Sequence, residues 1–312
     1  SGIGIQFDML EDTVYVIQTI AGGPSEKVGI LAGDRIISAN DTVLAGKKMP
    51  NTRVMKYLRG PKDSHVMLKV KRGDELIDFD VTRDDIPLYS VDETFMADPT
   101  TGYIHISRFA EDTPREVRDA MAKLRKQGMK DLILDLQGNG GGYLNAAIDL
   151  ANEFLKQKEL IVYTEGRAAR RSDFFAKGTG NFKNGRLIIL VDEYSASASE
   201  IVTGAIQDWD RGVVVGRRTF GKGLVQRPID LPDGSMIRLT IARYYTPSGR
   251  CIQKPYESIE KYNEDLIDRY NRGEMLSADS IHFPDSLKFK THKLERTVSV
   301  SYTHLTLPTN SL

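Results

Sequence analysis

The chain has 312 residues, of which 40% are hydrophobic, and its 43 basic side chains are matched by 43 acidic ones. Because this length exceeds that of a typical single domain, we expect two domains with a sizeable core. A net charge of zero without a basic stripe argues against a nucleic-acid partner. The single cysteine excludes an intramolecular disulfide, and the five histidines lack metal-ligand spacing, so neither a metal nor another cofactor is expected.

Residues 1–85 are predicted to form a separate module of short strands broken by turn residues. The expected strands are Ile3–Phe7, Val14–Ile20, Arg35–Ala39 and Val66–Lys71, with helical stretches at Ser25–Val28 and Thr52–Leu58. Together with the segments Ala32–Ile36 and Leu58–Pro61, this pattern resembles a PDZ domain of the circularly permuted type found in bacterial proteases. The resemblance makes Gly2, Ile3, Gly4 and Ile5 a loop whose backbone N–H groups bind a peptide's C-terminal carboxylate. A strand that merely begins with glycines is the alternative.

Residues 86–298 are expected to form the second domain. Gly102–Ser107 predicts a strand, and Thr113-Pro114 opens a helix that runs to about Lys126. Because β and α elements alternate from here onward, the pattern favours a layered α/β sheet.

A glycine-rich loop follows the next predicted strand, Asp131–Leu136, and precedes a helix. The glycines of Gln137–Gly142 let the backbone approach a ligand closely and aim N–H groups at an anion. The loop lacks the Lys-Ser/Thr pair of a nucleotide-binding loop. A tight turn is therefore the alternative to an anion site.

Three alternating serines lie between the predicted strand Arg186–Asp192 and a helix that begins near residue 200. Ser197 falls at or just before the first helical turn. Free N–H groups there, that of Ala198 among them, and the positive end of the helix dipole favour an alkoxide and an oxyanion. Helix capping by the serines is the alternative.

Lys222 follows in the turn Thr219–Gly223, and no histidine lies near either Ser197 or this lysine. A serine hydroxyl needs a base, and a lysine can serve only if burial lowers its pKa from about 10.4 towards neutrality. We therefore predict a serine–lysine dyad with a buried lysine. Asp233-Gly234 predicts a hairpin directly after Lys222 that fixes its position. Residues 257–293 are charged and helix-rich, with no predicted role.

Four segments resemble, in order and spacing, the signatures of the carboxyl-terminal processing peptidases, also called tail-specific proteases. They are Asp135–Gly142, Ser195–Ile201, Val215–Gln226 and Ala242–Gly249. The resemblance covers about residues 1–256 and implies an α/β (α+β) fold, with a PDZ domain followed by a crotonase/Clp-protease-like peptidase core. The family's nucleophile, its base and the glutamine that orients the base fall on Ser197, Lys222 and Gln226. Its oxyanion donors fall on Ala198 and on Gly141 or Gly142.

Two further polar residues of these motifs are expected to tune the site. Glu200 either supports the site indirectly or is a first-turn carboxylate stabilised by the helix dipole. Thr219 either accepts a hydrogen bond from the lysine ammonium or packs in a turn.

The sequence thus predicts a serine endopeptidase that recognises protein C-terminal tails through its PDZ domain and processes or degrades them. The expected partners are protein substrates with free, apolar C-termini. The sequence leaves open whether the protein also forms a homo-oligomer or binds an adaptor. The resemblance implies the periplasm or cell envelope, although no targeting or transmembrane segment is visible. A PDZ scaffold protein with an inactive core and a crotonase-like acyl-CoA enzyme are the alternatives.

Both ends of the chain are expected to be incomplete. The chain opens directly on the first PDZ strand, and residues 299–312 resemble a translated sequencing adapter. Native sequence is therefore expected to stop near Val298.

Overall fold

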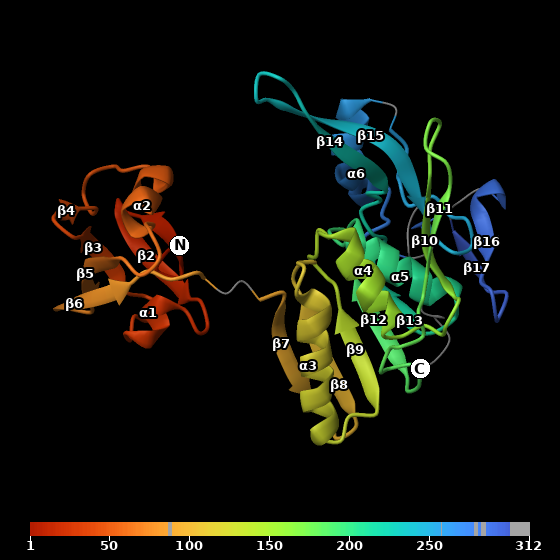
Figure 1. Cartoon of the computed structure of the whole chain (residues 1–312), viewed down its shortest axis with the longest axis horizontal. Helices are drawn as coiled ribbons and strands as arrows, with labels where there is room; N and C mark the ends of the chain where they lie inside the picture. The colour runs from red at the N-terminus through yellow and green to blue at the C-terminus, as the bar shows by residue number, and fades with distance from the viewer. Residues whose placement is uncertain (87–88, 257, 278–279, 282–284, 300–312) are drawn as a thin grey trace. The chain divides into compact units, whose positions relative to one another are not determined.

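The computed structural model describes residues 1–86, 89–256, 258–277, 280–281 and 285–299. The chain divides into two compact units, Ser1–Leu88 and Tyr89–Leu312 (Figure 1). Within the described residues, no helix is long and apolar enough to cross a membrane.

The first unit is an antiparallel sheet with two short helices. Its elements are β1 (Ile5–Leu10), β2 (Thr13–Thr19), α1 (Pro24–Lys27), β3 (Arg35–Ala39), β4 (Thr42–Val43), α2 (Asn51–Leu58), β5 (His65–Arg72) and β6 (Glu75–Thr82). The strand order is β1-β2-β3-β5-β6, with β4 paired to β3, so β1 lies at an edge. Val66, Leu68 and Val70 are fully buried because alternate residues of β5 face the core. The four strands predicted here from the sequence are confirmed.

The second unit is built on a mostly parallel sheet. It contains β7 (Val91–Met96), β8 (Thr101–Ile106), α3 (Thr113–Lys126), β9 (Asp131–Asp135), α4 (Leu144–Asn152), β10 (Leu160–Glu165), β11 (Ser172–Phe175), β12 (Leu187–Val191), α5 (Ala198–Asp208) and β13 (Val213–Gly216). The strand order is β13-β12-β9-β8-β7, with only the β7–β8 pair antiparallel. This arrangement confirms the layered α/β prediction.

Helices α3 and α5 pack on this sheet, and helices α4 and α5 contact a second one. Helix α3 packs on β7 and β8, α5 packs on β13, and α4 lies between α3 and α5 (Figure 1). Both α4 and α5 also contact β10, which belongs to the antiparallel sheet β11-β10-β15-β14. Helix α5, which contacts strands of both sheets, is consequently buried along its whole length.

The chain continues through β14 (Leu224–Asp230), β15 (Met236–Tyr245), α6 (Ile259–Asn271), a 3-10 turn at Asp285–Leu287, β16 (Lys288–Lys290) and β17 (Thr297–Ser299). The hairpin predicted at Asp233-Gly234 is confirmed: β14 pairs with β15, and Gly234 supplies the positive φ of the turn. Ser299 pairs with Lys288, and the rest of the segment predicted to be non-native lies outside the described residues.

Three neighbouring parallel strands, β9, β12 and β13, end at the same edge of the sheet. The three loops that follow them, residues 136–143, 192–197 and 217–223, therefore meet there. In an open α/β sheet this edge is the usual position of a ligand site.

Candidate active site

Hydrogen bonds join the first two of these loops directly. The Gly138 N–H donates to the Asp192 carboxylate at 2.9 Å, and the Ala196 N–H donates to the Asn139 carbonyl at 2.9 Å. Asp192 also accepts from the N–H of Ser195 at 3.0 Å, as an aspartate does when it closes a local turn. Sequence reasoning missed Asn139 and Asp192, although an aspartate three residues before a serine is a turn signal.

The buried side chain of Asn139 shapes the glycine-rich loop. Its Nδ2 donates to the Ile106 carbonyl at 2.7 Å, and its Oδ1 accepts from the Gly141 N–H at 2.8 Å. The Gly141 N–H is thus engaged, whereas no hydrogen bond to another described residue involves the N–H of Gly142 or Ala198. Of the two glycines that the sequence left as alternatives, Gly142 has the unengaged amide.

The glycine-rich loop passes directly against Ser197. A Cβ added to Gly141 would lie 2.7 Å from the Ser197 Cβ and 2.6 Å from the Ala196 carbonyl oxygen. A Cβ on Gly142 would lie 1.9 Å from the Phe109 carbonyl oxygen. A side chain at Gly141 would force the two loops apart, and one at Gly142 would clash with the main chain of Phe109.

The three serines of the second loop differ in accessibility. Ser195 and Ser199 are fully buried, and their hydroxyls donate to the carbonyls of Leu136 at 2.7 Å and Asn139 at 2.9 Å. Ser197 is only half-buried. It lies immediately before α5, as predicted, with a φ of 57° and a ψ of −111°. That backbone conformation is rare for a residue with a side chain.

Glu200 connects the loop of Ser197 to the loop of Lys222. This carboxylate is 1% exposed, and its Oε2 accepts from the N–H groups of Ser197 and Lys222, both at 2.8 Å. Its Oε1 accepts from the Gly221 N–H at 2.7 Å and from the Thr219 hydroxyl at 2.8 Å. Burial raises the pKa of Glu200, and these four hydrogen bonds oppose that rise. The Thr219 hydroxyl thus donates to a carboxylate, and no hydrogen bond joins it to the lysine ammonium.

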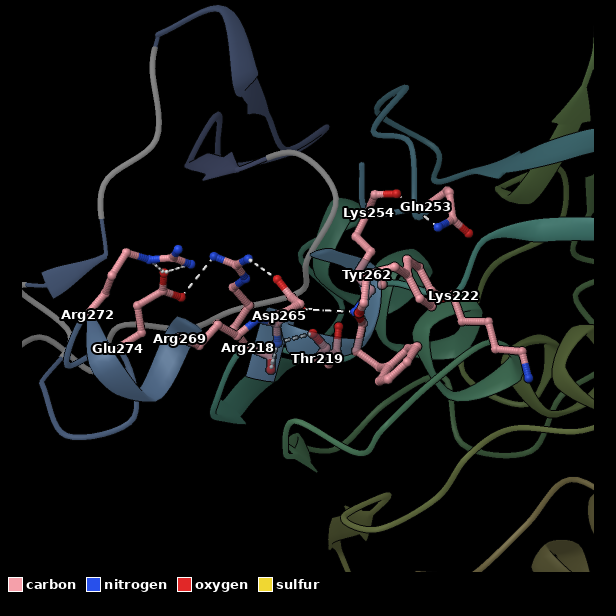
Figure 2. Close-up of polar contacts among 12 residues, drawn as sticks. Arg218, Thr219, Lys222, Gln253, Lys254, Tyr262, Asp265, Arg269, Arg272 and Glu274 are labelled. Atoms are coloured by element: carbon pink, nitrogen blue, oxygen red, sulfur yellow. Dashed lines mark hydrogen bonds and ion pairs between the residues drawn. The ribbon is translucent and has the colours of Figure 1, made fainter. Parts of the chain in front are cut away.

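The Lys222 side chain does not have the burial that the sequence predicted. It is exposed, and among the described residues no partner hydrogen-bonds to its Nζ. Figure 2 shows it extending away from the polar cluster that surrounds Asp265. The main chain of Lys222 is fixed by Glu200, whereas its side chain is exposed.

Gln226 pairs with Thr240 in the β14–β15 ladder, and its exposed side chain makes no hydrogen bond to another described residue. It lines a cavity of about 720 Å³ between the β14–β15 hairpin and the segment that leads to α6. The cavity's other walls include Leu224, Thr240, Lys254 and Tyr256.

The predicted carboxylate loop of the first unit has two unengaged amides. Gly2 pairs with Asp84: its N–H donates to the Asp84 carbonyl at 3.0 Å, so this amide is not available to a ligand. For Ile3 and Gly4, no hydrogen bond to a described residue involves the N–H, and Gly4 has a φ of 73°. Ile5 begins the edge strand β1.

Comparisons with known proteins agree with this architecture. The family model for peptidase family S41 matches residues 100–260, and that for the PDZ domain matches residues 1–82. A probable CtpA-like serine protease of Staphylococcus aureus strain N315 is 36% identical over 252 residues, which is 80% of this chain and 50% of the relative. Its counterpart in Staphylococcus epidermidis strain ATCC 12228 is 35% identical over the same length. The chain thus spans about half the length of the curated relatives that it matches.

Among solved structures, the photosystem II D1 C-terminal processing protease is 32% identical, with a TM-score of 0.50, over 81% of this chain and 69% of its own. A putative S41 protease from Bacteroides fragilis NCTC 9343 has a TM-score of 0.53 at 17% identity, over 80% of this chain and 72% of its own, and shows the fold alone. The family resemblance inferred from the four motifs is confirmed, and the chain belongs to peptidase family S41, with a PDZ domain before the peptidase domain.

Proposed function

We propose that the protein is a serine endopeptidase in which Ser197 is the nucleophile and Lys222 is its base. The observation that carries the proposal is Glu200, whose buried carboxylate binds the backbone N–H of both residues and so fixes one loop against the other. The burial of the hydroxyls of Ser195 and Ser199 favours Ser197 over its neighbours.

In the proposed reaction, the Ser197 Oγ attacks a substrate peptide carbonyl while its proton passes to Lys222 Nζ. The N–H groups of Ala198 and Gly142 stabilise the oxyanion of the tetrahedral intermediate. Lys222 then gives the proton to the leaving amine, which breaks the peptide bond and leaves an ester on Ser197. Water, deprotonated by the same lysine, hydrolyses that ester.

Because the Lys222 side chain is exposed, the bound substrate has to help activate it as a base in this scheme. A lysine ammonium has no lone pair and cannot accept the serine proton, and covering it with apolar groups favours the neutral amine that can. We assign that covering to the bound substrate chain, with the Gln226 amide oxygen accepting from Nζ and holding it near Ser197.

A serine-directed peptidyl phosphonate, whose peptide part can cover Lys222 as a substrate would, tests this function against its alternatives. A peptidase should be modified covalently at Ser197, which mass spectrometry of the digested protein locates. A PDZ scaffold protein with an inactive core should remain unmodified. An acyl-CoA enzyme should also remain unmodified and should bind a CoA thioester. Modification at Ser195 or Ser199 would contradict the assignment.

The PDZ domain is proposed to bring substrates to this site by their C-termini. The unengaged amides of Ile3 and Gly4, at the start of an edge strand, suit a terminal carboxylate followed by a peptide that extends the sheet. The proposed partners are protein substrates with free, apolar C-termini. By analogy with the family, the proposed location is the periplasm or cell envelope.

Amidation of a substrate's C-terminus should reduce its cleavage at low concentration at least about tenfold, or roughly 1.4 kcal/mol. The amide removes the charge that the Ile3 and Gly4 N–H groups would bind, and it leaves the scissile region unchanged. Values of kcat/KM for the paired free and amidated peptides check this. As a control, a short non-cleavable peptide with the same free tail should inhibit cleavage of the free substrate only. Equal cleavage of both substrates would show that this enzyme does not recognise the free C-termini of its substrates.

A further inference from the structure

A buried arginine on α6 binds the backbone of the loop that leads to Lys222. Arg269 is 1% exposed. Its Nη1 donates to the carbonyls of Thr219 at 2.9 Å and Arg218 at 3.2 Å. Its Nη2 donates to the Phe220 carbonyl at 3.4 Å. One guanidinium thus contacts three consecutive carbonyls just before Lys222.

Asp265, one helical turn before Arg269, holds that guanidinium in place. Its carboxylate accepts from Arg269 Nη2 at 2.8 Å and from Lys254 Nζ at 3.1 Å (Figure 2). Lys254 is 2% exposed, and its backbone N–H donates to the Gly221 carbonyl at 2.9 Å. Its ammonium lies 4.3 Å from the ring centre of Phe220, so this second cation also contacts the loop.

A further ion pair ties the same loop to the segment after α6. Arg218 Nη1 lies 2.8 Å from Glu274 Oε2, and both side chains are at most about one-tenth exposed. Glu274 also pairs with Arg272 at 3.0 Å. The loop is therefore held by side chains from both α6 and the residues that follow it.

Two sets of hydrogen bonds hold residues 218–222. In one set the loop accepts hydrogen bonds, and in the other it donates them. Arg269 donates to the carbonyls of residues 218–220. From the side of Ser197, Glu200 accepts from the Thr219 hydroxyl and from the N–H groups of residues 221 and 222. The Phe220 N–H also donates to the Ser195 carbonyl at 3.0 Å, so the loop is bound on the side of Ser197 as well as on the side of α6.

We infer that Arg269 is a positioning residue. It fixes the position of the Lys222 Cα relative to Ser197. This inference rests on the proposed role of Lys222 as the base. Helix α6 begins at Ile259, and the S41 family match ends at residue 260, so the positioning comes from a segment almost entirely outside that match.

The geometry requires a guanidinium. Its planar fork presents several N–H donors in fixed directions, whereas an ammonium is a single point donor on a flexible stem. In an Arg269→Lys variant the charge near Asp265 stays, but the three carbonyls can no longer be bound together.

Arg211 offers a matched control in the same unit. Its guanidinium also donates to three backbone carbonyls, those of Phe154 at 3.0 Å, Phe182 at 2.7 Å and Gly185 at 3.1 Å. None of these residues belongs to the loops around Ser197. Arg211→Lys therefore removes the same kind of contact without affecting the position of Lys222.

The experiment measures the rate of phosphonate labelling of the full chain against pH, together with thermal unfolding. Arg269→Lys should label at least about tenfold more slowly at neutral pH, because a small displacement of a base has a large effect on rate. The midpoint of its pH profile should also move. Arg211→Lys should lower the unfolding temperature about as much as Arg269→Lys does. It should nevertheless keep the wild-type labelling rate and pH profile.

Wild-type labelling and an unchanged profile in folded Arg269→Lys would overturn the inference, as would an equal loss in Arg211→Lys. If Arg269→Lys does not fold, Asp265→Asn decides: slower labelling with a shifted profile supports the inference, and the wild-type rate overturns it. Lys222→Ala separates the two proposals. If it labels at the wild-type rate, the dyad is wrong and the inference falls with it. If it does not label while Arg269→Lys labels normally, only the inference fails.

Discussion

Replacement of Ser197 by alanine should lower the rate of substrate cleavage at least about a thousandfold. The change removes one oxygen, and with it the group that we propose forms the ester with the substrate. Ser195 and Ser199 cannot substitute for it, because both are fully buried with their hydroxyls bonded to backbone carbonyls. Cleavage of a fluorogenic peptide with a free, apolar C-terminus measures the loss.

Two controls accompany this variant. Its affinity for a tail peptide should stay at the wild-type value, since the PDZ domain is a separate compact unit. Ser199→Ala should keep its activity if it folds, because the Ser199 hydroxyl donates to the Asn139 carbonyl and has no part in the proposed reaction. Near-normal cleavage by Ser197→Ala would move the nucleophile to another residue.

Lys222→Arg should be as inactive as Lys222→Ala, with both rates reduced at least about a hundredfold. Arginine keeps the positive charge and nearly the same length, but it does not lose its proton in the working pH range. If the lysine acted only through its charge, the arginine variant would retain much of the activity. Single-turnover rates of acylation, measured for the two variants together, distinguish these roles.

The elements around the site could be predicted from local sequence patterns. Each of the two strand–loop–helix units is encoded by a short apolar run, a loop of small residues and an amphipathic helix, and β9 with α4 and β12 with α5 are found where expected. The hairpin after Lys222 was also predictable, since Asp-Gly between two strand-like runs specifies a tight turn. Each of these signals lies within a stretch of about 20 residues of the chain.

The contacts that hold the loops together could not be predicted in this way. The four partners of Glu200 come from two loops that meet only because β12 and β13 pair in parallel. The predicted burial of Lys222 was wrong because burial depends on which distant segments pack over a side chain, and α6 packs over Arg218 to Phe220 instead. Charged residues 257–293 carry no periodic signal that would reveal a buried ion cluster.

The unusual backbone of Ser197 has an evolutionary consequence. A side chain held at positive φ costs about 1–3 kcal/mol, which is a measurable part of the 5–15 kcal/mol that stabilises a typical domain. Glycine would remove that cost, and on the proposed role of Ser197 as nucleophile it is the need for its hydroxyl that maintains a serine at this position. In a lineage that no longer needs the chemistry, the simplest inactivating change would make the fold more stable. Descendants without catalytic activity should therefore arise and persist readily on this scaffold.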